Sequence, residues 1–293
     1  MKYTFSGHET FQCKNMWLKK GYDFVKAGKS FNDDTAVVDL GVGKNMVASI
    51  KFWLKSFGII DEDNQTTKFG DLIFADNGYD PFLEDPNTLW FLHFQLIHTY
   101  YATLYRQVFV NFHKERKEFS KTNIFNFIKR QFADKAFEKT IYNENTINKD
   151  IATLLKMYVI PDNYTFDDFS SVLIDLNLIK KVEKDLYEFN YVTKAELNPL
   201  VFLYAVRSIA PTAKVVEYDR LLELSLMFCL SQGDMYEIFA GLTAINNKIT
   251  FDNAAGEQLF VINDDIDTYD VLSMYYNQNW GNEVFYINKY RKG

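Results

Sequence analysis

Between residues 36 and 60 the apolar and polar positions follow the pattern of two helices joined by a glycine turn. With Gly41 as the turn, apolar residues fall where the two helices of a helix-turn-helix must bury side chains against each other. These residues are Ala36, Leu40, Val42, Val47 and Ile50. The pattern predicts a second helix over residues 44–57.

The predicted second helix has an apolar face and a polar face. Val47, Ile50, Leu54 and Phe57 share the apolar face. A lysine stripe lies about 110° around the helix axis from that face, formed by Lys44, Lys51 and Lys55. Asn45 and Ser49 are predicted to point away from the core. Such a surface suits a DNA groove, and it equally suits an ordinary amphipathic helix at a protein surface.

The same order of elements recurs three times along the chain. An amphipathic stretch leads into an apolar junction (residues 57–60, 176–179 and 242–245), and a charged, hairpin-like stretch follows. Each copy is predicted to be a winged helix-turn-helix. The predicted domains are 1–117 with a long aromatic-rich linker helix from Thr88 to about Lys117, then 118–197, then 198–293. The expected fold class is mainly helical (α+β), with small antiparallel hairpins.

Charge is unevenly distributed along the chain. The net charge is −7, yet residues 1–60 hold nine lysines and five acids, so that segment is +4 and the remainder is −11. This asymmetry is expected if only the first module meets a polyanion. Two cysteines exclude a disulfide framework. The start of the chain does not resemble a signal peptide, and polar residues interrupt the longest apolar run, so a cytoplasmic protein without membrane contact is predicted.

Residues 5–11, FSGHETF, place a histidine and an acid between aromatic residues. One interpretation makes His8 a general base or metal ligand with Glu9 as its partner. The other makes Ser6 the N-cap of a helix and Glu9 the residue that completes its capping box.

Residues 80–86, DPFLEDP, supply a second group of acids, among them Glu84 and Asp85. Clustered carboxylates such as these are required for metal-dependent phosphodiester chemistry. The alternative is that Asp85 or Asn87 caps a helix that begins near Thr88. The sequence contains no recognisable nuclease or hydrolase motif.

Five motifs together carry a family resemblance: residues 5–11, Cys13 with Lys14, WLKKG at 17–21, LGVGKNMV at 40–47 and DPFLEDPNTLW at 80–90. Their combination resembles the bacterial family known as domain of unknown function 4007. Members of that family are similar to SspB, a component of the single-strand DNA phosphorothioation defence systems that is described as a DNA nickase. The resemblance implies double-stranded DNA as a ligand. It also implies a cysteine desulfurase, an ATPase and an ATP-pyrophosphatase-like protein as partners, but it carries over no catalytic residue.

The sequence therefore favours a multi-winged-helix, DNA-binding component of a phosphorothioation-type system. Lys44, Asn45, Lys51 and Lys55 are predicted to meet DNA, supported by Lys14, Lys19 and Lys20. If the chain nicks DNA with Mg²⁺ or Mn²⁺, the candidate catalytic residues are His8 and Glu9, then Glu84 and Asp85. The alternative function is a non-enzymatic winged-helix adaptor or transcription regulator.

Overall fold

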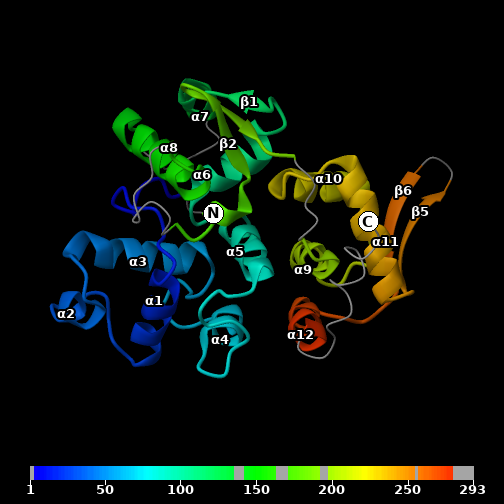
Figure 1. Ribbon diagram of the computed structural model, residues 1–293, viewed down its shortest axis with the longest axis horizontal. Helices are drawn as coiled ribbons and strands as arrows, with labels where there is room; N and C mark the ends of the chain where they lie inside the picture. The colour runs from blue at the N-terminus through cyan, green and yellow to red at the C-terminus, as the bar shows by residue number, and fades with distance from the viewer. Residues whose placement is uncertain (1–2, 135–141, 163–170, 192–196, 255–256, 280–293) are drawn as a thin grey trace. The chain divides into compact units, whose positions relative to one another are not determined.

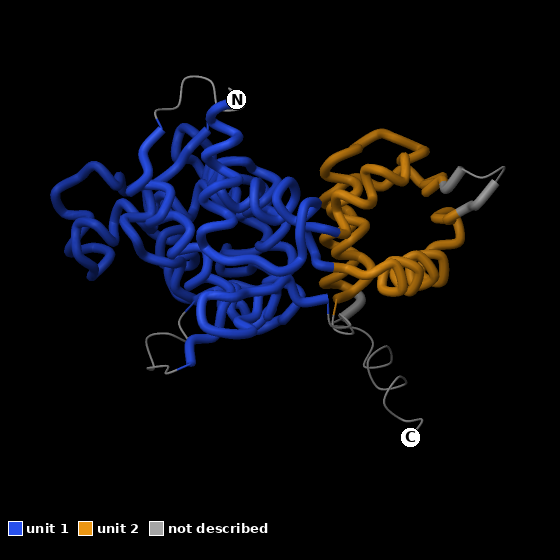
Figure 2. Tube along the Cα trace, turned by 90° about the horizontal axis from the view of Figure 1, so that it is seen from above, with its two compact units in different colours: residues 1–192, 226–229 blue, residues 193–225, 230–293 orange. Residues whose placement is uncertain are grey.

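A computed structural model describes residues 3–134, 142–162, 171–191, 197–254 and 257–279 (Figure 1). Contacts divide the chain into two compact units (Figure 2): unit 1 is Met1–Val192 with Leu226–Cys229, and unit 2 is Thr193–Ser225 with Leu230–Gly293. The described part is mainly helical with two small antiparallel sheets, which confirms the predicted α+β class. The predicted boundary between residues 117 and 118 lies within unit 1, and the three-domain division stays a prediction.

The chain begins with the helices α1 (Trp17–Lys26), α2 (Ala36–Leu40) and α3 (Lys44–Ser56). Gly41 turns the chain between α2 and α3 with a φ of 60°, in the left-handed region that favours glycine. The inward side of α3 is fully buried at Ile50, Trp53 and Leu54. A bridge between Ile60 and Thr66 closes a short hairpin after it. The predicted helix, glycine turn and helix are confirmed.

The predicted long linker helix is wrong, because the chain breaks after α5. Following α4 (Lys68–Phe74), α5 spans Pro86–His98, and then come α6 (Thr103–Arg106) and the π-helical η1 (Gln107–Phe112). Tyr100 adopts a φ of 60°, and Thr99 Oγ1 donates to the carbonyl of Ser56 at 2.8 Å. These two features turn the backbone where apolar periodicity predicts a continuous helix. No helix among the described residues is long and apolar enough to span a bilayer.

The second half of unit 1 contains β1 (Glu118–Phe119), α7 (Lys121–Ala133), α8 (Glu144–Tyr158), the 3₁₀ turn η3 (Ile174–Leu176), β2 (Ile179–Glu183) and β3 (Leu186–Phe189). The strands form one antiparallel sheet in the order β1-β3-β2. Ser120 and Asn123 form a capping box that starts α7. Phe119 and Phe189 are fully buried on the inner face of the sheet.

Unit 2 repeats this order of elements. It contains α9 (Pro199–Ile209), β4 (Val215–Glu217), α10 (Tyr218–Met227), α11 (Gln232–Ile245), β5 (Ile249–Ala254), β6 (Glu257–Ile262) and α12 (Thr268–Asn279). Its sheet has the order β4-β6-β5, so in both sheets the third strand lies between the first and the second. Among the described residues, α7 and α8 lie between β1 and the β2–β3 hairpin, and α10 and α11 lie between β4 and the β5–β6 hairpin (Figure 1).

Two buried histidines hold the segment Leu226–Cys229 in unit 1. His93 Nε2 lies 2.7 Å from the carbonyl oxygen of Met227, and His113 Nδ1 lies 3.0 Å from that of Leu226. Each of these nitrogens donates, because a carbonyl can only accept. The opposite ring nitrogens lie 2.7 Å from tyrosine hydroxyls, Tyr158 for His93 and Tyr191 for His113. Both imidazoles are therefore hydrogen-bonded at both ring nitrogens in the core.

Candidate nucleic-acid interface

The N-terminal half of α3 presents an open, cationic surface. Lys44 and Asn45 are exposed and Lys51 is half-buried. Within the described residues, none of the three side chains forms a hydrogen bond or an ion pair. No side chain caps the helix at Gly43, no acid lies in its first turn, and nothing lies within 4 Å of a Cβ built at Gly41 or Gly43. The free backbone N–H groups and the lysines therefore face the same open space, an arrangement that favours an anion.

Two other residues of α3 do not belong to this surface. Ser49 is fully buried, and its Oγ donates to the carbonyl of His8 at 3.0 Å, so the prediction that it points away from the core is wrong. The loop that contains His8 covers this side of the helix. Lys55 Nζ donates to the carbonyl of Glu62 at 2.8 Å, lies 3.4 Å from its carboxylate, and is 6.0 Å from the ring centre of Tyr101. Lys55 thus already has local partners.

The lysines of α1 are also engaged. Lys19 Nζ lies 2.6 Å from Asp23 and 3.4 Å from Asp76. Burial disfavours the charged form of Lys19, but the hydrogen bonds and charges of the two carboxylates outweigh it, so its pKa is raised. Lys20 is exposed, and its Nζ donates to the carbonyl of Leu40 at 3.1 Å, where it closes the C-terminal end of α2.

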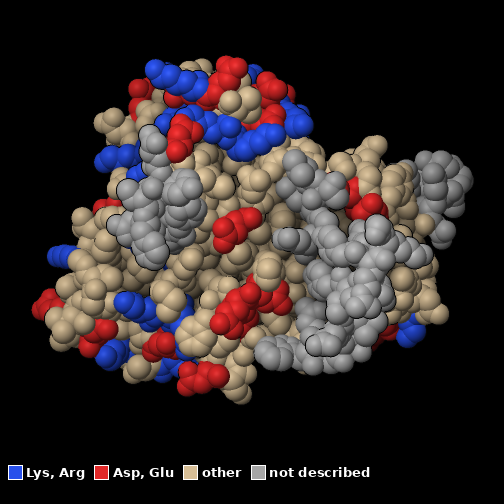
Figure 3. Space-filling view, in the orientation of Figure 1, with Lys and Arg blue, Asp and Glu red and all other residues tan. Residues whose placement is uncertain are grey.

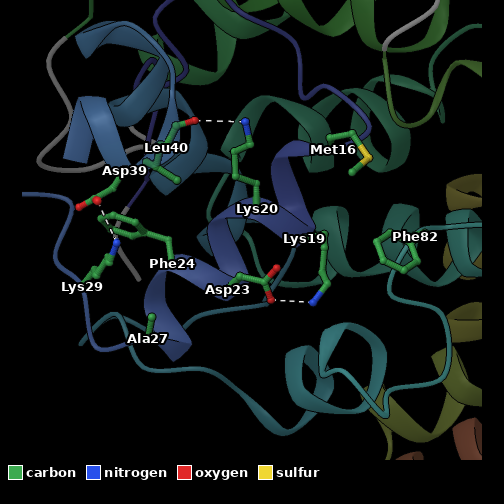
Figure 4. A pocket seen from close by; sticks show the side chains of 10 residues that line it. All are labelled: Met16, Lys19, Lys20, Asp23, Phe24, Ala27, Lys29, Asp39, Leu40 and Phe82. Atoms are coloured by element: carbon green, nitrogen blue, oxygen red, sulfur yellow. Dashed lines mark hydrogen bonds and ion pairs between the residues drawn. The ribbon is translucent and has the colours of Figure 1, made fainter. Parts of the chain in front are cut away.

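An open hollow of about 560 Å³ lies beside these lysines (Figure 4). Figure 4 shows that the ion pair of Lys29 with Asp39, at 2.8 Å, occupies one part of it. Lys14 lies outside the hollow, half-buried in a backbone bridge with Ser171. The residues that line the hollow are Met16, Lys19, Lys20, Asp23, Phe24, Ala27, Lys29, Asp39, Leu40 and Phe82. Its cations are mostly neutralised, unlike Lys44 and Lys51 of α3.

A second gathering of basic side chains lies over the β1-β3-β2 sheet and α7. Figure 3 shows Lys and Arg concentrated there on the face displayed, interspersed with acids. Lys180 Nζ lies 2.5 Å from Glu188 across the sheet, and Lys181 is ion-paired with Asp162. Because acids compensate Lys180 and Lys181, these two lysines are weaker candidates than Lys44 and Lys51 of α3 for contact with a polyanion.

His8 is buried and pairs with Asp150 of α8. His8 Nε2 lies 2.9 Å from Asp150 Oδ1, and the backbone N–H of Ser6 donates to the same carboxylate at 2.9 and 3.1 Å. The N–H of Thr10 donates to His8 Nδ1 at 3.2 Å, which assigns the proton to Nε2. The ring stacks on Trp53 with centroids 5.8 Å apart. Both ring nitrogens are thus occupied, and the pair fastens the loop of residues 5–11 to α8.

Glu9 lies on the outer side of this loop and is exposed. Ser6, Gly7, Glu9 and Thr10 all have positive φ, between 46° and 112°. No helix starts at Ser6, since the first helix of the described chain is α1, so the capping-box interpretation is wrong. Left-handed backbone at three non-glycine residues is costly and persists because the buried histidine pair enforces it.

The acidic turn at residues 80–86 is organised by Asp80. Its carboxylate accepts the backbone N–H groups of Glu84 and Asp85 at 2.8 and 3.0 Å and the hydroxyl of Thr88 at 2.5 Å. Asp85 caps α5 by accepting the N–H of Asn87 at 2.8 Å, which confirms the capping alternative for this residue. Glu84 is exposed. Among the described residues, no three His, Cys, Asp or Glu side chains are grouped as a metal site.

Sequence reasoning missed Asp150, and it included Asp80 only as one of three clustered acids and not as the residue that holds the turn. The signal for Asp150 was present, because it lies between Ile147 and Ile151 on the apolar side of α8. An acid on the apolar side of a helix is buried, and a buried carboxylate requires hydrogen-bond or charge partners. Its partner, 142 residues away, could not be identified from spacing.

The fold and this surface define an α+β, mainly helical protein with a cationic helix, α3, that follows a glycine turn. The chain belongs to the family described as protein of unknown function DUF4007, whose model matches residues 5–276, and the predicted family is confirmed. Two solved structures are similar to it: magnesium ion-bound SspB, with a TM-score of 0.83, and SspB, with a TM-score of 0.81. Each is 24% identical, and the match covers 96% of this chain and 90% of the other. This likeness shows the fold. No curated protein matches the sequence.

Proposed function

We propose that this chain is a DNA-binding component of a phosphorothioation-type modification and defence system, and that α3 meets the duplex. The observation that carries the proposal is a set of side chains without partners in the described chain, Lys44, Asn45 and Lys51, beside an uncapped helix start. The similarity to SspB supports membership of such a system. A cysteine desulfurase, an ATPase and an ATP-pyrophosphatase-like protein would then be its partners.

Each of these side chains suits a different part of the duplex. Lys44 and Lys51 carry the charge that phosphates attract, and the amide of Asn45 can pair with a base edge in the major groove. The turn at Gly41 and Gly43 leaves backbone N–H groups open to a phosphate. Lys14, Lys19, Lys20 and Lys55 add flanking positive charge, and those with local partners shape the surface more than they contact the ligand.

The repeated order of elements supports winged-helix modules. In the β1-β3-β2 and β4-β6-β5 sheets the hairpin would be the wing, and α8 and α11 would hold the place that α3 holds in the first module. We therefore propose three such modules, over residues 1–117, 118–197 and 198–293. The three third helices then differ in what they expose, and only α3 presents unpaired lysines without an exposed acid.

The proposal is tested by fluorescence anisotropy with a labelled duplex and the full chain. The double variant Lys44→Ala/Lys51→Ala should bind about tenfold more weakly, because two charge contacts are removed. The matched control is Lys180→Ala/Lys181→Ala, which removes two lysines already paired with acids, and it should stay within about twofold of the unsubstituted chain. Equal losses in both variants would contradict a specific role for α3.

Nicking is a second candidate, favoured by the magnesium ion in one of the similar SspB structures. Mg²⁺ keeps several waters and uses one or two carboxylates together with substrate phosphates, so Glu84 and Asp85 could serve it without a third ligand. His8 could take part in catalysis only if its hydrogen bonds with Asp150 and Thr10 opened. Glu9, the next residue, is exposed.

A supercoiled plasmid with Mg²⁺ or Mn²⁺ tests this second candidate. Nicking through the turn predicts an open-circle product that Glu84→Gln abolishes, while Asp85→Asn keeps the helix cap and reports on metal binding alone. Glu9→Gln is the control for the loop at residues 5–11. Duplex binding without any open-circle product would instead support the adaptor or regulator function.

A further inference from the structure

The outward side of α11 differs in chemistry from that of α3. Its exposed residues are Gln232, Gly233, Tyr236, Glu237, Ala240, Thr243 and Ala244, with no lysine or arginine among them. The described part of unit 2, residues 197–254 and 257–279, contains eleven acidic and four basic residues. Of these four, Arg207 is buried and Lys248 is paired with Asp264 at 2.9 Å. A phosphate backbone would meet repulsion here.

Three aromatic rings form a patch beside this helix: Tyr218 at the start of α10, Tyr236 of α11 and Phe251 of β5. The ring centre of Phe251 lies 6.2 Å from that of Tyr218 and 6.0 Å from that of Tyr236. Phe239 stacks behind Phe251 at 4.5 Å with an interplanar angle of 22° and fixes its position. Tyr236 is 50% exposed, and Tyr218 and Phe251 are half-buried. The patch is thus preformed and reachable from solvent.

Acidic residues flank the same rings along the chain. Glu217 and Asp219 stand on either side of Tyr218, Glu237 follows Tyr236, and all three acids are exposed. Arg220 is two positions beyond Tyr218 on α10, about 200° around the helix, so it lies on another side. Electron-rich ring faces surrounded by carboxylates attract a cation, and a guanidinium can stack on such a face as well as pair with the acids.

No basic side chain of the described residues occupies these rings. Two half-buried tyrosines elsewhere in the chain carry a cation of the protein itself: Arg106 lies 4.3 Å from the ring centre of Tyr100, and Lys117 lies 5.1 Å from that of Tyr191. Neither Tyr218, Tyr236 nor Phe251 has such a contact within the described ranges. The aromatic patch of unit 2 is therefore open to a cation from outside the chain.

We propose that Tyr218, Tyr236 and Phe251, with the acids beside them, form a docking site for an arginine- or lysine-rich segment of a partner protein. The partner's cation would lie over the rings of Tyr218 and Tyr236, and its neighbouring basic residues would pair with Glu217 and Asp219. This site does not depend on whether α3 binds DNA. It gives unit 2 a protein partner, in contrast with the polyanion proposed for unit 1.

The test uses the full chain and a fluorescein-labelled decapeptide of arginine, titrated by anisotropy. Tyr218→Leu/Tyr236→Leu removes the ring faces but keeps apolar bulk, and it should weaken binding about tenfold, since exposed cation–π contacts each contribute roughly fivefold. Tyr218→Phe/Tyr236→Phe keeps the faces and should bind within about twofold of the unsubstituted chain. Glu217→Gln/Asp219→Asn should weaken binding and lower its salt dependence.

The matched variants make each outcome decisive. Equal binding by the Leu and Phe variants would mean that bulk negative charge alone holds the peptide, and it would overturn the proposal. A labelled single-stranded oligonucleotide serves as the second probe, because aromatic rings also stack on bases. Loss of oligonucleotide affinity in the Leu variant, with peptide binding unchanged, would assign the patch to nucleic acid and equally overturn the proposal. Near-identical circular dichroism of the variants excludes loss of fold.

Discussion

The proposed winged-helix modules give α3 in unit 1 and α11 in unit 2 the same position, but these two helices expose opposite chemistry. Each buries one apolar side, at Ile50 and Trp53 in α3 and at Met235 and Phe239 in α11. Each precedes a hairpin. α3 turns lysines and an asparagine outward, whereas α11 turns a tyrosine, an acid and small residues outward.

This difference shows that the succession of elements places a helix at the surface, while a few exposed side chains decide what that helix can meet. The two helices also begin differently. α3 follows a glycine turn and has no side-chain cap, whereas Ser231 and Asp234 form a capping box at the start of α11. The open start of α3 leaves N–H groups for an anion, and the closed start of α11 does not.

The largest expected difference between the units is the loss of folding stability at low pH. Burial lowers the pKa of His113 to about 4, with hydrogen bonds to backbone carbonyls opposing it and the charge of Lys117 adding to it. In the unfolded chain the pKa of this imidazole is near 6.5. Between pH 6.5 and pH 4 the unfolded chain therefore binds a proton that the folded chain does not, and this proton favours unfolding. The free energy of unfolding of unit 1 should fall by about 3 kcal/mol from pH 7 to pH 4. All four histidines of the chain lie within its first 113 residues, so no histidine of unit 2 shares the effect.

Amide hydrogen exchange at pH 7 and pH 4.5 measures the loss of stability for each unit separately. Protection should fall in unit 1 more than in unit 2, and His113→Gln should flatten the dependence on pH across this range. A parallel decline in both units, unchanged by the substitution, would contradict protonation of His113 as the cause.

A smaller loss is expected from the loop that covers α3. Asp150→Asn should lower the free energy of unfolding by about 2 kcal/mol, because donors from Ser6 and His8 lose a buried carboxylate acceptor. Glu9→Gln is the matched control, since Glu9 is exposed, and it should change stability by less than about 0.5 kcal/mol. Urea unfolding followed by tryptophan fluorescence measures both. A Glu9→Gln effect as large as that of Asp150→Asn would make Glu9 a partner of His8 after all.

The smallest effects concern the two helix starts. Ser231→Ala should destabilise unit 2 by about 1 kcal/mol, because its hydroxyl accepts the N–H of Asp234. Gly43→Ser should stabilise unit 1 by a few tenths of a kcal/mol, since the position is open and its φ of −67° suits serine. If the new hydroxyl occupies an N–H group that DNA uses, this variant should also bind duplex less tightly. Thermal unfolding and duplex titration of the same samples check both effects.

Local patterns predicted well where a single element decides the outcome. The glycine turn, the bounds of α3 and the cap at Asp85 follow from residues within a few positions of each other. Prediction failed where distant segments meet. Ser49 is buried because the loop at His8 lies over it, and the helix after α5 breaks where Thr99 reaches Ser56. The candidate DNA-binding residues stay a prediction, and the sequence could not show which of their lysines already have partners.

The central claim is that α3 holds DNA through charges that no other described part of the chain neutralises. The most direct measurement is the salt dependence of duplex affinity for the full chain and for Lys44→Ala/Lys51→Ala. Each lost phosphate contact lowers the slope of log K against log salt concentration by about 0.9, so the double variant should show a slope smaller in magnitude by about 1.8. A slope equal to that of the unsubstituted chain would contradict the claim and place the DNA contact elsewhere.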